Sequence, residues 1–444
     1  MYQPVSSSGS PQQRLTLFDC VCIIVGIIIG AGIFESTPKI AGNVSSPGWM
    51  IVAWLLGGLI SLIGALCYAE LATAYPRNGG DYVFLTRAFG PRTGLLFAWA
   101  SFWIVRPGNI GAMAFIFGRY AEQLLPLGTD GLDTLTYAIG AIVPLTLLNI
   151  VGVEPGKWTQ NALTAVKVLG LLVVVVAGFL ALEPTSAVIA STTGGDFGFA
   201  MILVLFTFGG WNEMSYVAAE VRRPNQNILR ALLLGTLVVT GVYVLVNLAA
   251  IAALGFGGLQ KASSYAADVA GTRAIGILVC ISCLGAINGM IFTGARIFHA
   301  VGTEHRHCRW FGQWNPRLQT PARALVLQSA VTLALMIGFG AYKDGFDRLV
   351  VFTGPLFWVF LLMTGISLFV LRIREPATVR PYRVLLYPLT PVLFCLSTAY
   401  MLYASVSYAW AMRYAEGLWA VAAMIVGAVW VWYEGRPRSD DAAG

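Results

Sequence analysis

Residues 26–38 read GIIIGAGIFESTP and lie inside the first long apolar segment of the chain. Three glycines fall within the first seven of these residues, and each glycine inside a helix costs about 1 kcal/mol relative to alanine. Glu35 follows shortly afterwards, in a segment where a membrane helix normally avoids charge. The stretch therefore predicts a membrane helix that is broken near its middle, with a carboxylate beside the break.

The composition predicts an all-α polytopic membrane protein. Hydrophobic residues make up 57% of the 444 residues and charged residues only 11%, and the mean hydropathy is +0.73. A soluble domain of this length carries more charge. The apolar segments predict about twelve transmembrane helices. Their expected ranges are 16–41, 48–74, 89–121, 136–152, 158–182, 197–220, 227–256, 270–302, 322–341, 346–371, 384–408 and 414–433.

The basic residues predict how the chain is oriented and do not indicate nucleic-acid binding. With the N-terminus inside, nineteen Lys and Arg residues lie on the inner side, Arg296 among them, and seven on the outer side, Arg119 among them. This excess follows the positive-inside rule. We therefore expect a multi-pass protein of the cytoplasmic (plasma) membrane, with short cytoplasmic tails at 1–15 and 434–444.

A second interrupted segment lies five spans after the first. Residues 202–220 read ILVLFTFGGWNEMSYVAAE, in which Gly209 and Gly210 are followed by Asn212 and Glu213. Because five is odd, a second five-helix unit would cross the membrane in the opposite orientation to the first. Paired broken helices in such an inverted repeat indicate a transporter's binding site. The expected units are a first repeat at 16–182, an inverted second repeat at 197–371 and two additional helices at 384–433.

Broken membrane helices have a specific chemical use. Free backbone N–H and C=O groups are costly in lipid, so an unwound segment persists only where it lines a protein cavity. The N-terminus of a half-helix attracts a carboxylate, and released carbonyls accept hydrogen bonds from an ammonium. An α-amino acid carries both groups. Glycines can also serve close helix packing, but two clusters at matching positions, each followed by polar residues, favour a binding site.

The same residues resemble a known family. GIIIGAGIF resembles the first-helix signature of the amino acid–polyamine–organocation (APC) superfamily, and FTFGGWNEMSYVAAEVRRPNQN resembles the sixth helix of its L-type amino acid transporter (LAT) branch. Four further blocks match in order between residues 15 and 433. The resemblance implies a LeuT-type five-plus-five inverted repeat with two extra C-terminal helices.

The resemblance also implies how a substrate binds. The substrate carboxylate would meet backbone amides of the first break, and the amino group would meet carbonyls of both breaks. Phe206 matches an aromatic residue that closes over substrate, while Ala31 stands where many members have a serine hydroxyl. The substrate-binding residues expected on this basis are Ile27, Ile28, Gly30, Ala31, Gly32, Phe206, Gly209, Gly210 and Asn212.

Lys167 is an ionisable residue about 14 Å along its predicted helix, at 1.5 Å per residue. It matches a lysine that many family members carry where related symporters bind sodium. The residue is either a structural tether between helices or a titrating proton carrier, and we favour the tether.

Three other charges are expected inside the membrane, namely Glu35, Glu213 and Arg106. Arg106 either pairs with one of the carboxylates behind the site, or a carboxylate stays unpaired and selects a cationic substrate or carries a proton. The pairing is favoured because buried charges are usually paired. Pro107 is expected to kink the helix after Arg106. The gate or specificity candidates are Phe206, Trp211, Glu213, Glu35 and Trp358.

The resemblance implies a secondary active transporter of L-amino acids that works by alternating access, as a sodium-independent exchanger of neutral amino acids. Two alternatives stay open: a proton-coupled transporter or antiporter of cationic amino acids or amines, and a non-transporting membrane nutrient sensor. We expect no cofactor, no metal and no enzyme activity, because no nucleophile–base pair or ligand cluster is evident. Residues 122–135 contain no cysteine, so no disulfide-linked glycoprotein subunit is expected. Glu220 resembles an inner gate, or is a solvated helix end.

Overall fold

The computed structural model describes residues 11–128, 132–180, 195–262, 272–340, 345–412 and 415–434. Within these ranges the chain is almost entirely helical. Ten helices are long and apolar enough to cross a membrane, and an eleventh span results if the bent pair α1 and α2 is counted as one. The predicted class, an all-α polytopic membrane protein, is confirmed.

The first part of the chain forms the helices that carry the first break. They are α1 (Leu17–Ile28), α2 (Gly32–Gly42), α3 (Pro47–Ala74), α4 (Asp81–Phe89), α5 (Pro91–Ala100), η1 (Ser101–Val105), α6 (Arg106–Leu124), α7 (Asp133–Val151) and α8 (Val153–Leu180).

The second part carries the other break and the C-terminal helices. They are α9 (Phe197–Thr207), η2 (Trp211–Glu220), α10 (Pro224–Lys261), α12 (Thr272–Glu304), η3 (Arg306–Cys308), α13 (Ala322–Phe339), α14 (Gly345–Arg374), α15 (Leu389–Met412) and α16 (Glu416–Glu434).

The span expected at 89–121 is a composite helix. α5, η1 and α6 follow one another without a gap from Pro91 to Leu124, which is long enough to cross a bilayer. A π-helical turn lies at Ser101–Val105, and Pro107, where a kink is expected, lies in the first turn of α6. π-turns of this kind occur often at functional sites.

The first predicted break is present. α1 begins at a capping box formed by Thr16 and Asp19 and ends at Ile28, and α2 starts at Gly32 with a bend of 50° between them. Glu35 lies in the first turn of α2. The glycine-rich stretch therefore ends one half-helix and begins another, as expected.

The second break has a different local structure. α9 ends at Thr207, and Gly210 has a φ of +117°, a left-handed conformation that disfavours a side chain. The residues from Trp211 to Glu220 form a 3-10 segment. Sequence alone indicates the position of the break, whereas the tighter winding after it is seen only in the structure.

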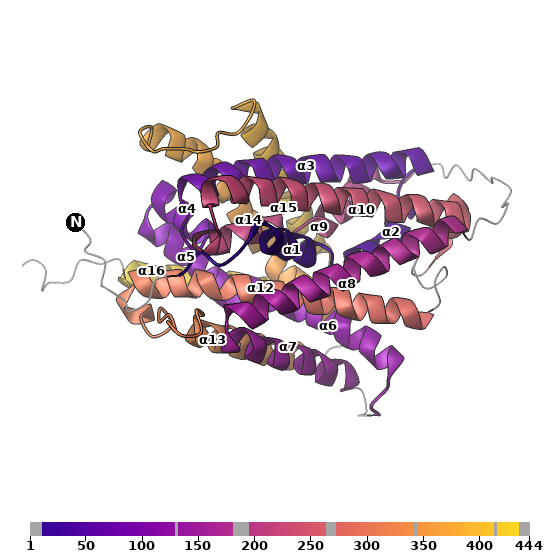
Figure 1. Cartoon of the computed structure of the whole chain (residues 1–444), viewed down its shortest axis with the longest axis horizontal. Helices are drawn as coiled ribbons and strands as arrows, with labels where there is room; N and C mark the ends of the chain where they lie inside the picture. Colours follow the sequence, from indigo (N-terminus) through magenta and orange to yellow (C-terminus); the bar gives the residue numbers. More distant parts are fainter. Residues whose placement is uncertain are drawn as a thin grey trace, which may run out of the picture.

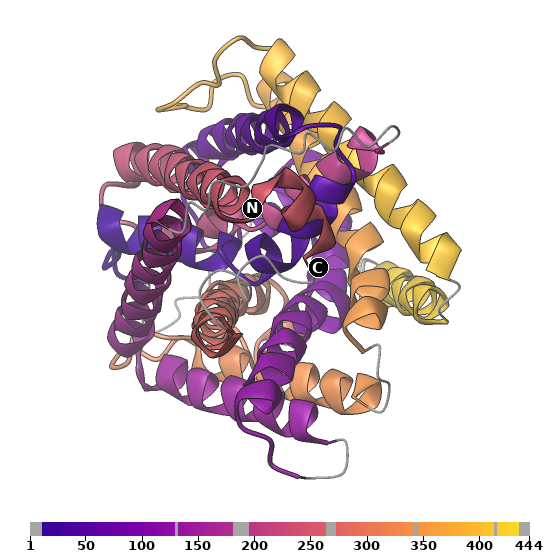
Figure 2. The ribbon, with the colours of Figure 1, turned by 90° about the vertical axis from the view of Figure 1, so that its right-hand side faces the viewer.

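The two broken helices lie inside the bundle. Figure 1 shows α1 and α2 near its middle, with the long helices α8 and α12 passing beside them. Viewed along the bundle, α15 and α16 lie at its outer edge (Figure 2). The inverted relation between the two five-helix units stays a prediction.

Candidate binding site between two broken helices

A cavity of about 240 Å³ lies between the two breaks. Every residue predicted to bind substrate lines it, together with Glu35, Glu213 and Trp358. Much of the remaining wall is apolar. Its other lining residues are Ser36, Lys39, Asn109, Ala112, Met113, Ile116, Leu203, Thr207, Ala286, Met290, Phe346, Val350, Thr353, Gly354 and Phe357.

The first break presents free backbone donors to this cavity. The N–H groups of a helix's first turn have no partner within the helix, and α2 begins at Gly32. No hydrogen bond is recorded for the Ala31 or Gly32 amide within the described ranges. The Gly30 amide, by contrast, donates to the Ile28 carbonyl at 2.9 Å. In this conformation Ala31 and Gly32 are therefore the available amides.

Tyr243 of α10 connects the two breaks. Its hydroxyl lies 3.0 Å from the Ile28 carbonyl and 3.2 Å from the Thr207 carbonyl, and its side chain is fully buried. A hydroxyl has one proton and donates to one of these carbonyls at a time. A tyrosine in an apolar helix carries no sequence signal that would single it out, and only the folded chain brings Tyr243 to both unwound segments.

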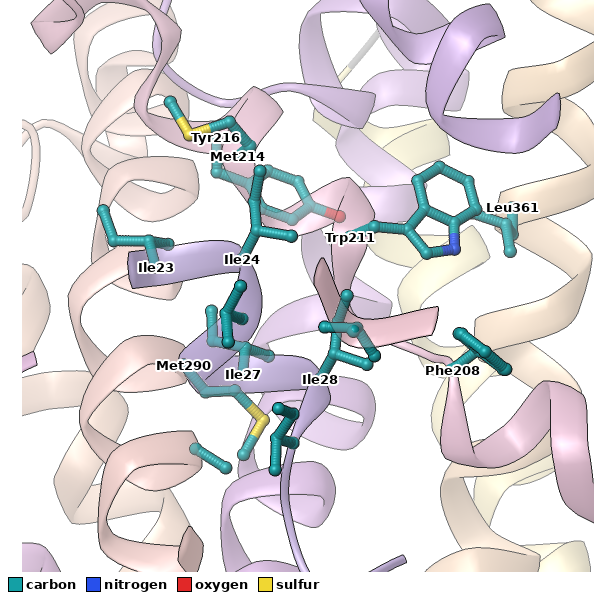
Figure 3. Packing of buried hydrophobic residues seen from close by; sticks show 14 of the residues in the cluster. Ile23, Ile24, Ile27, Ile28, Phe208, Trp211, Met214, Tyr216, Met290 and Leu361 are labelled. Atoms are coloured by element: carbon teal, nitrogen blue, oxygen red, sulfur yellow. The ribbon is translucent and has the colours of Figure 1, made fainter. Parts of the chain in front are cut away.

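The aromatic candidates divide between the cavity and the protein interior. Phe206 and Trp358 line the cavity, and 46% of the surface of Phe206 is exposed. Trp211 does not line it. Its ring packs edge-on against Tyr68 and lies beside Leu361, turned away from Ile27 and Ile28 (Figure 3). The structure therefore places Trp211 in the packing behind the second break.

Arg106 has Glu213 as its partner. Its Nη1 atom lies 2.6 Å from one carboxylate oxygen of Glu213 and 2.7 Å from the other, with both side chains almost fully buried. Thr293 of α12 also donates to Glu213, and the guanidinium lies 4.4 Å from the centre of the Tyr216 ring. One of the two carboxylates expected in the membrane is thus neutralised by Arg106.

Glu35 pairs with Arg119 and not with Arg106, the partner considered from the sequence. The Arg119 guanidinium lies 2.7 Å from its carboxylate, so the idea that Glu35 pairs with Arg106 is wrong. The positive-inside pattern predicts Arg119 to be a charge on the outer side. It is 13 residues, more than three turns, beyond Arg106 on α6, and it therefore reaches α2 where Arg106 cannot.

Lys167 is fully buried and bound to three carbonyls. Its ammonium donates to Gly26 and Ile29 at 2.8 Å and to Ser282 at 2.9 Å. The three acceptors match the three donors of an ammonium group. They belong to α1, the segment after it, and α12, so Lys167 of α8 holds the first broken helix against its neighbours.

The bundle is closed at the end that contains Glu220, called here the Glu220 end. Glu220 is almost fully buried and pairs with Arg296 at 2.9 Å, and Asn78 also donates to it. The solvated-helix-end interpretation of Glu220 is therefore wrong. Arg296, counted among the inner-side charges, is itself completely buried.

The N-terminal segment completes this closure. Leu15 donates its amide to the Glu220 carbonyl at 2.9 Å and accepts from the Arg222 amide at 2.8 Å. Asp19 accepts a hydrogen bond from Asn161 at 2.6 Å. At the opposite end, called the Glu35 end, the cavity reaches Lys39, which is exposed.

A many-span helical bundle with two facing helix breaks around one cavity defines a substrate-binding membrane protein of the transporter type. A family model described as amino acid permease matches residues 15–430. The chain therefore belongs to the amino acid permease family, within the APC superfamily that the sequence resembles.

The relatives are similar along nearly the whole chain. The b(0,+)-type amino acid transporter 1 of Mus musculus is 28% identical over 443 residues, which covers 96% of this chain and 89% of the relative. The large neutral amino acids transporter small subunit 2 of Oryctolagus cuniculus is 31% identical over 417 residues, covering 88% and 76%. Both similarities agree with the L-type branch.

Proposed function

We propose that this protein is a secondary transporter that exchanges neutral L-amino acids across the membrane by alternating access. The relatives named above are amino acid transporters, and one of them is named for large neutral amino acids. The substrate carboxylate would meet the Ala31 and Gly32 amides, while its ammonium would meet carbonyls at the breaks. Phe206 and Trp358 would lie against its side chain.

One observation favours substrates with neutral side chains over substrates with cationic side chains. Both carboxylates that line the cavity already have a cation: Glu35 is bound by Arg119 and Glu213 by Arg106. A cationic side chain would have to displace one of these arginines. The apolar residues Ile116, Leu203 and Met290 instead offer contacts that suit an apolar side chain.

The environment of Lys167 favours exchange over proton coupling through this residue. Three carbonyls hold its ammonium, and no carboxylate is paired with it within the described ranges. A proton carrier must lose its proton during transport, and the neutral amine, with two N–H groups, would leave one of these three carbonyls without a donor. The arrangement supports the tether.

Closure at one end supports alternating access. The pair formed by Glu220 and Arg296 and the strand-like pairing of Leu15 seal the Glu220 end, whereas the cavity extends towards Lys39. We place the Glu220 end and both termini in the cytoplasm, following the positive-inside excess, and the protein in the plasma membrane. The absence of cysteine from 122–135 argues against a disulfide-linked glycoprotein, although one relative is named a small subunit.

Counterflow in proteoliposomes tests the proposal. Vesicles containing the purified protein are loaded with one unlabelled amino acid, and uptake of labelled leucine is measured with and without a sodium or pH gradient. We expect neutral amino acids inside to accelerate uptake several-fold without either gradient. Protein-free vesicles provide the control. If none of the twenty amino acids or a set of diamines accelerates uptake, the protein is not such an exchanger.

A further inference from the structure

A buried carboxylate that the binding site does not use lies behind the second break. Asp81, at the start of α4, accepts hydrogen bonds from Tyr68 at 2.6 Å and from Tyr216 at 2.5 Å, and it is only 3% exposed. No cation forms an ion pair with it in the part of the chain that the structure describes. Its two oxygens are therefore satisfied by the two phenol groups.

Tyr216 links this carboxylate to the cavity. Its hydroxyl also lies 3.3 Å from the side-chain nitrogen of Asn212, and Asn212 lines the cavity beside Gly209 and Gly210. The three side chains thus form a chain of hydrogen bonds from Asp81 through Tyr216 to Asn212. A second, narrower cavity touches Asp81 and Tyr216 and shares Asn109 and Glu213 with the main one.

The direction of this chain follows from the number of protons available. A phenol has one proton to donate and can also accept. While Asp81 is ionised, its carboxylate accepts a hydrogen bond from the Tyr216 hydroxyl. That hydroxyl can then only accept from Asn212, so the amide nitrogen must face Tyr216. The amide oxygen of Asn212 is left without a partner among the described residues and is available to the cavity.

We propose that Asp81 is a positioning residue for substrate binding, which acts through Tyr216 to keep the side-chain oxygen of Asn212 directed at the substrate ammonium. An oxygen in this position accepts a hydrogen bond from the ammonium, whereas the amide nitrogen would repel it. The inference rests on the proposed function, because it requires a substrate with an ammonium group at the breaks.

The pKa of Asp81 depends on its burial and on the groups that surround it. The groups around it that carry or can acquire charge are Tyr68 of α3, Tyr216 and Glu213 of η2, and Arg106 of α6, while α14 contributes the uncharged Thr364. Burial raises the pKa of Asp81 to about 6, against the opposing effect of the two tyrosine hydrogen bonds. Asp81 is therefore ionised at neutral pH and gains a proton as the pH falls through about 6.

Protonation of Asp81 would reverse the direction of the hydrogen bonds that link Asp81, Tyr216 and Asn212. A carboxyl that is protonated on the oxygen facing Tyr216 donates to the Tyr216 hydroxyl. The proton of that hydroxyl must then turn to the Asn212 oxygen, and the amide nitrogen is left facing the cavity. The KM for a neutral amino acid should therefore rise below about pH 6 in the wild-type protein. Tyr216→Phe removes the hydroxyl that links Asp81 to Asn212, so the rise in KM at low pH should disappear.

A double-mutant cycle tests the proposal at pH 7.5. Counterflow KM values are measured for wild type, Asp81→Leu, Tyr216→Phe and the double variant, with Tyr68→Phe as the matched control that removes the other phenol from Asp81. We expect each of the first two substitutions to raise KM about tenfold, the size of a hydrogen bond to a charged group. The double variant should be no worse than Tyr216→Phe, because both act through one chain. Tyr68→Phe should stay within about twofold of wild type.

Several results would overturn the proposal. Effects of Asp81→Leu and Tyr216→Phe on KM that multiply in the double variant would indicate independent structural roles. An unchanged KM in Tyr216→Phe, or a wild-type pH profile retained in this variant, would exclude the chain even if Asp81→Leu fails to fold. Failure of wild-type counterflow would instead contradict the proposed function, so the two failures are distinguishable.

Discussion

The Arg106 guanidinium and the Glu213 carboxylate lie 2.6 Å apart in the wall of the cavity, with only 5% and 7% of their side chains exposed. Removing one partner of a buried pair leaves an uncompensated charge and typically costs about 3–5 kcal/mol. We therefore expect Glu213→Gln to lower thermal stability in detergent strongly and to abolish uptake.

Exchange of the two charges identifies the pair. The double variant Arg106→Glu/Glu213→Arg should recover part of the lost stability, measured by thermal unfolding of the purified protein. Glu35→Arg combined with Arg106→Glu serves as the mismatched control, since these residues are not partners, and it should show no recovery. Equal recovery in both combinations would contradict the pairing described here.

Arg119 is expected to control discrimination against cationic substrates. Its side chain is 49% exposed and its partner Glu35 lines the cavity, so the pair contributes little to stability, about 0–1 kcal/mol. Arg119→Leu frees the carboxylate. Competition of labelled leucine uptake by lysine or arginine should then strengthen about tenfold, whereas Arg273→Leu, an exposed arginine of α12, should leave competition unchanged. Unaltered competition in Arg119→Leu would mean that Glu35 does not face the substrate.

Lys167→Gln should reduce transport without altering its pH dependence. A glutamine amide can donate to at most two of the three carbonyls that the ammonium binds, and a buried acceptor left unpaired costs about 1–3 kcal/mol. Uptake is measured between pH 5.5 and 8.5 in both proteins, after normalisation to the amount of folded protein. Loss of the wild-type pH profile in the variant would assign the proton-carrier role to Lys167.

Gly210→Ala should abolish transport, while Gly241→Ala should be tolerated. Gly210 has a φ of +117°, and an added Cβ would lie 2.8 Å from the Ile27 side chain across the other break. A left-handed conformation alone costs a non-glycine residue about 1–2 kcal/mol. A Cβ at Gly241 of α10 would meet nothing within 4 Å. Comparable uptake by both variants would show that the second break does not need its glycine.

The glycine pattern was sufficient to predict both breaks, because an unwound membrane segment needs residues with a weak helix propensity. The expected substrate-binding residues near the breaks came from the family resemblance, and all of them line the cavity. The partners of the charges could not be predicted in this way, because they depend on helix rotation and on which helices become neighbours. Thus Arg119 reaches Glu35, and Trp211, although it lies next to Asn212 in sequence, points to the other side of the segment.

Opening of the contact between the N-terminal segment and the second broken helix can be followed by hydrogen–deuterium exchange. The amides of Leu15 and Arg222 each donate to the backbone across this contact, and buried hydrogen-bonded amides exchange with deuterium only when the structure opens around them. Access to the cavity from the Glu220 end requires these two segments to separate. The deuterium uptake of peptides that contain Leu15 or Arg222 should therefore report the fraction of time that this end is open, without any label on the protein.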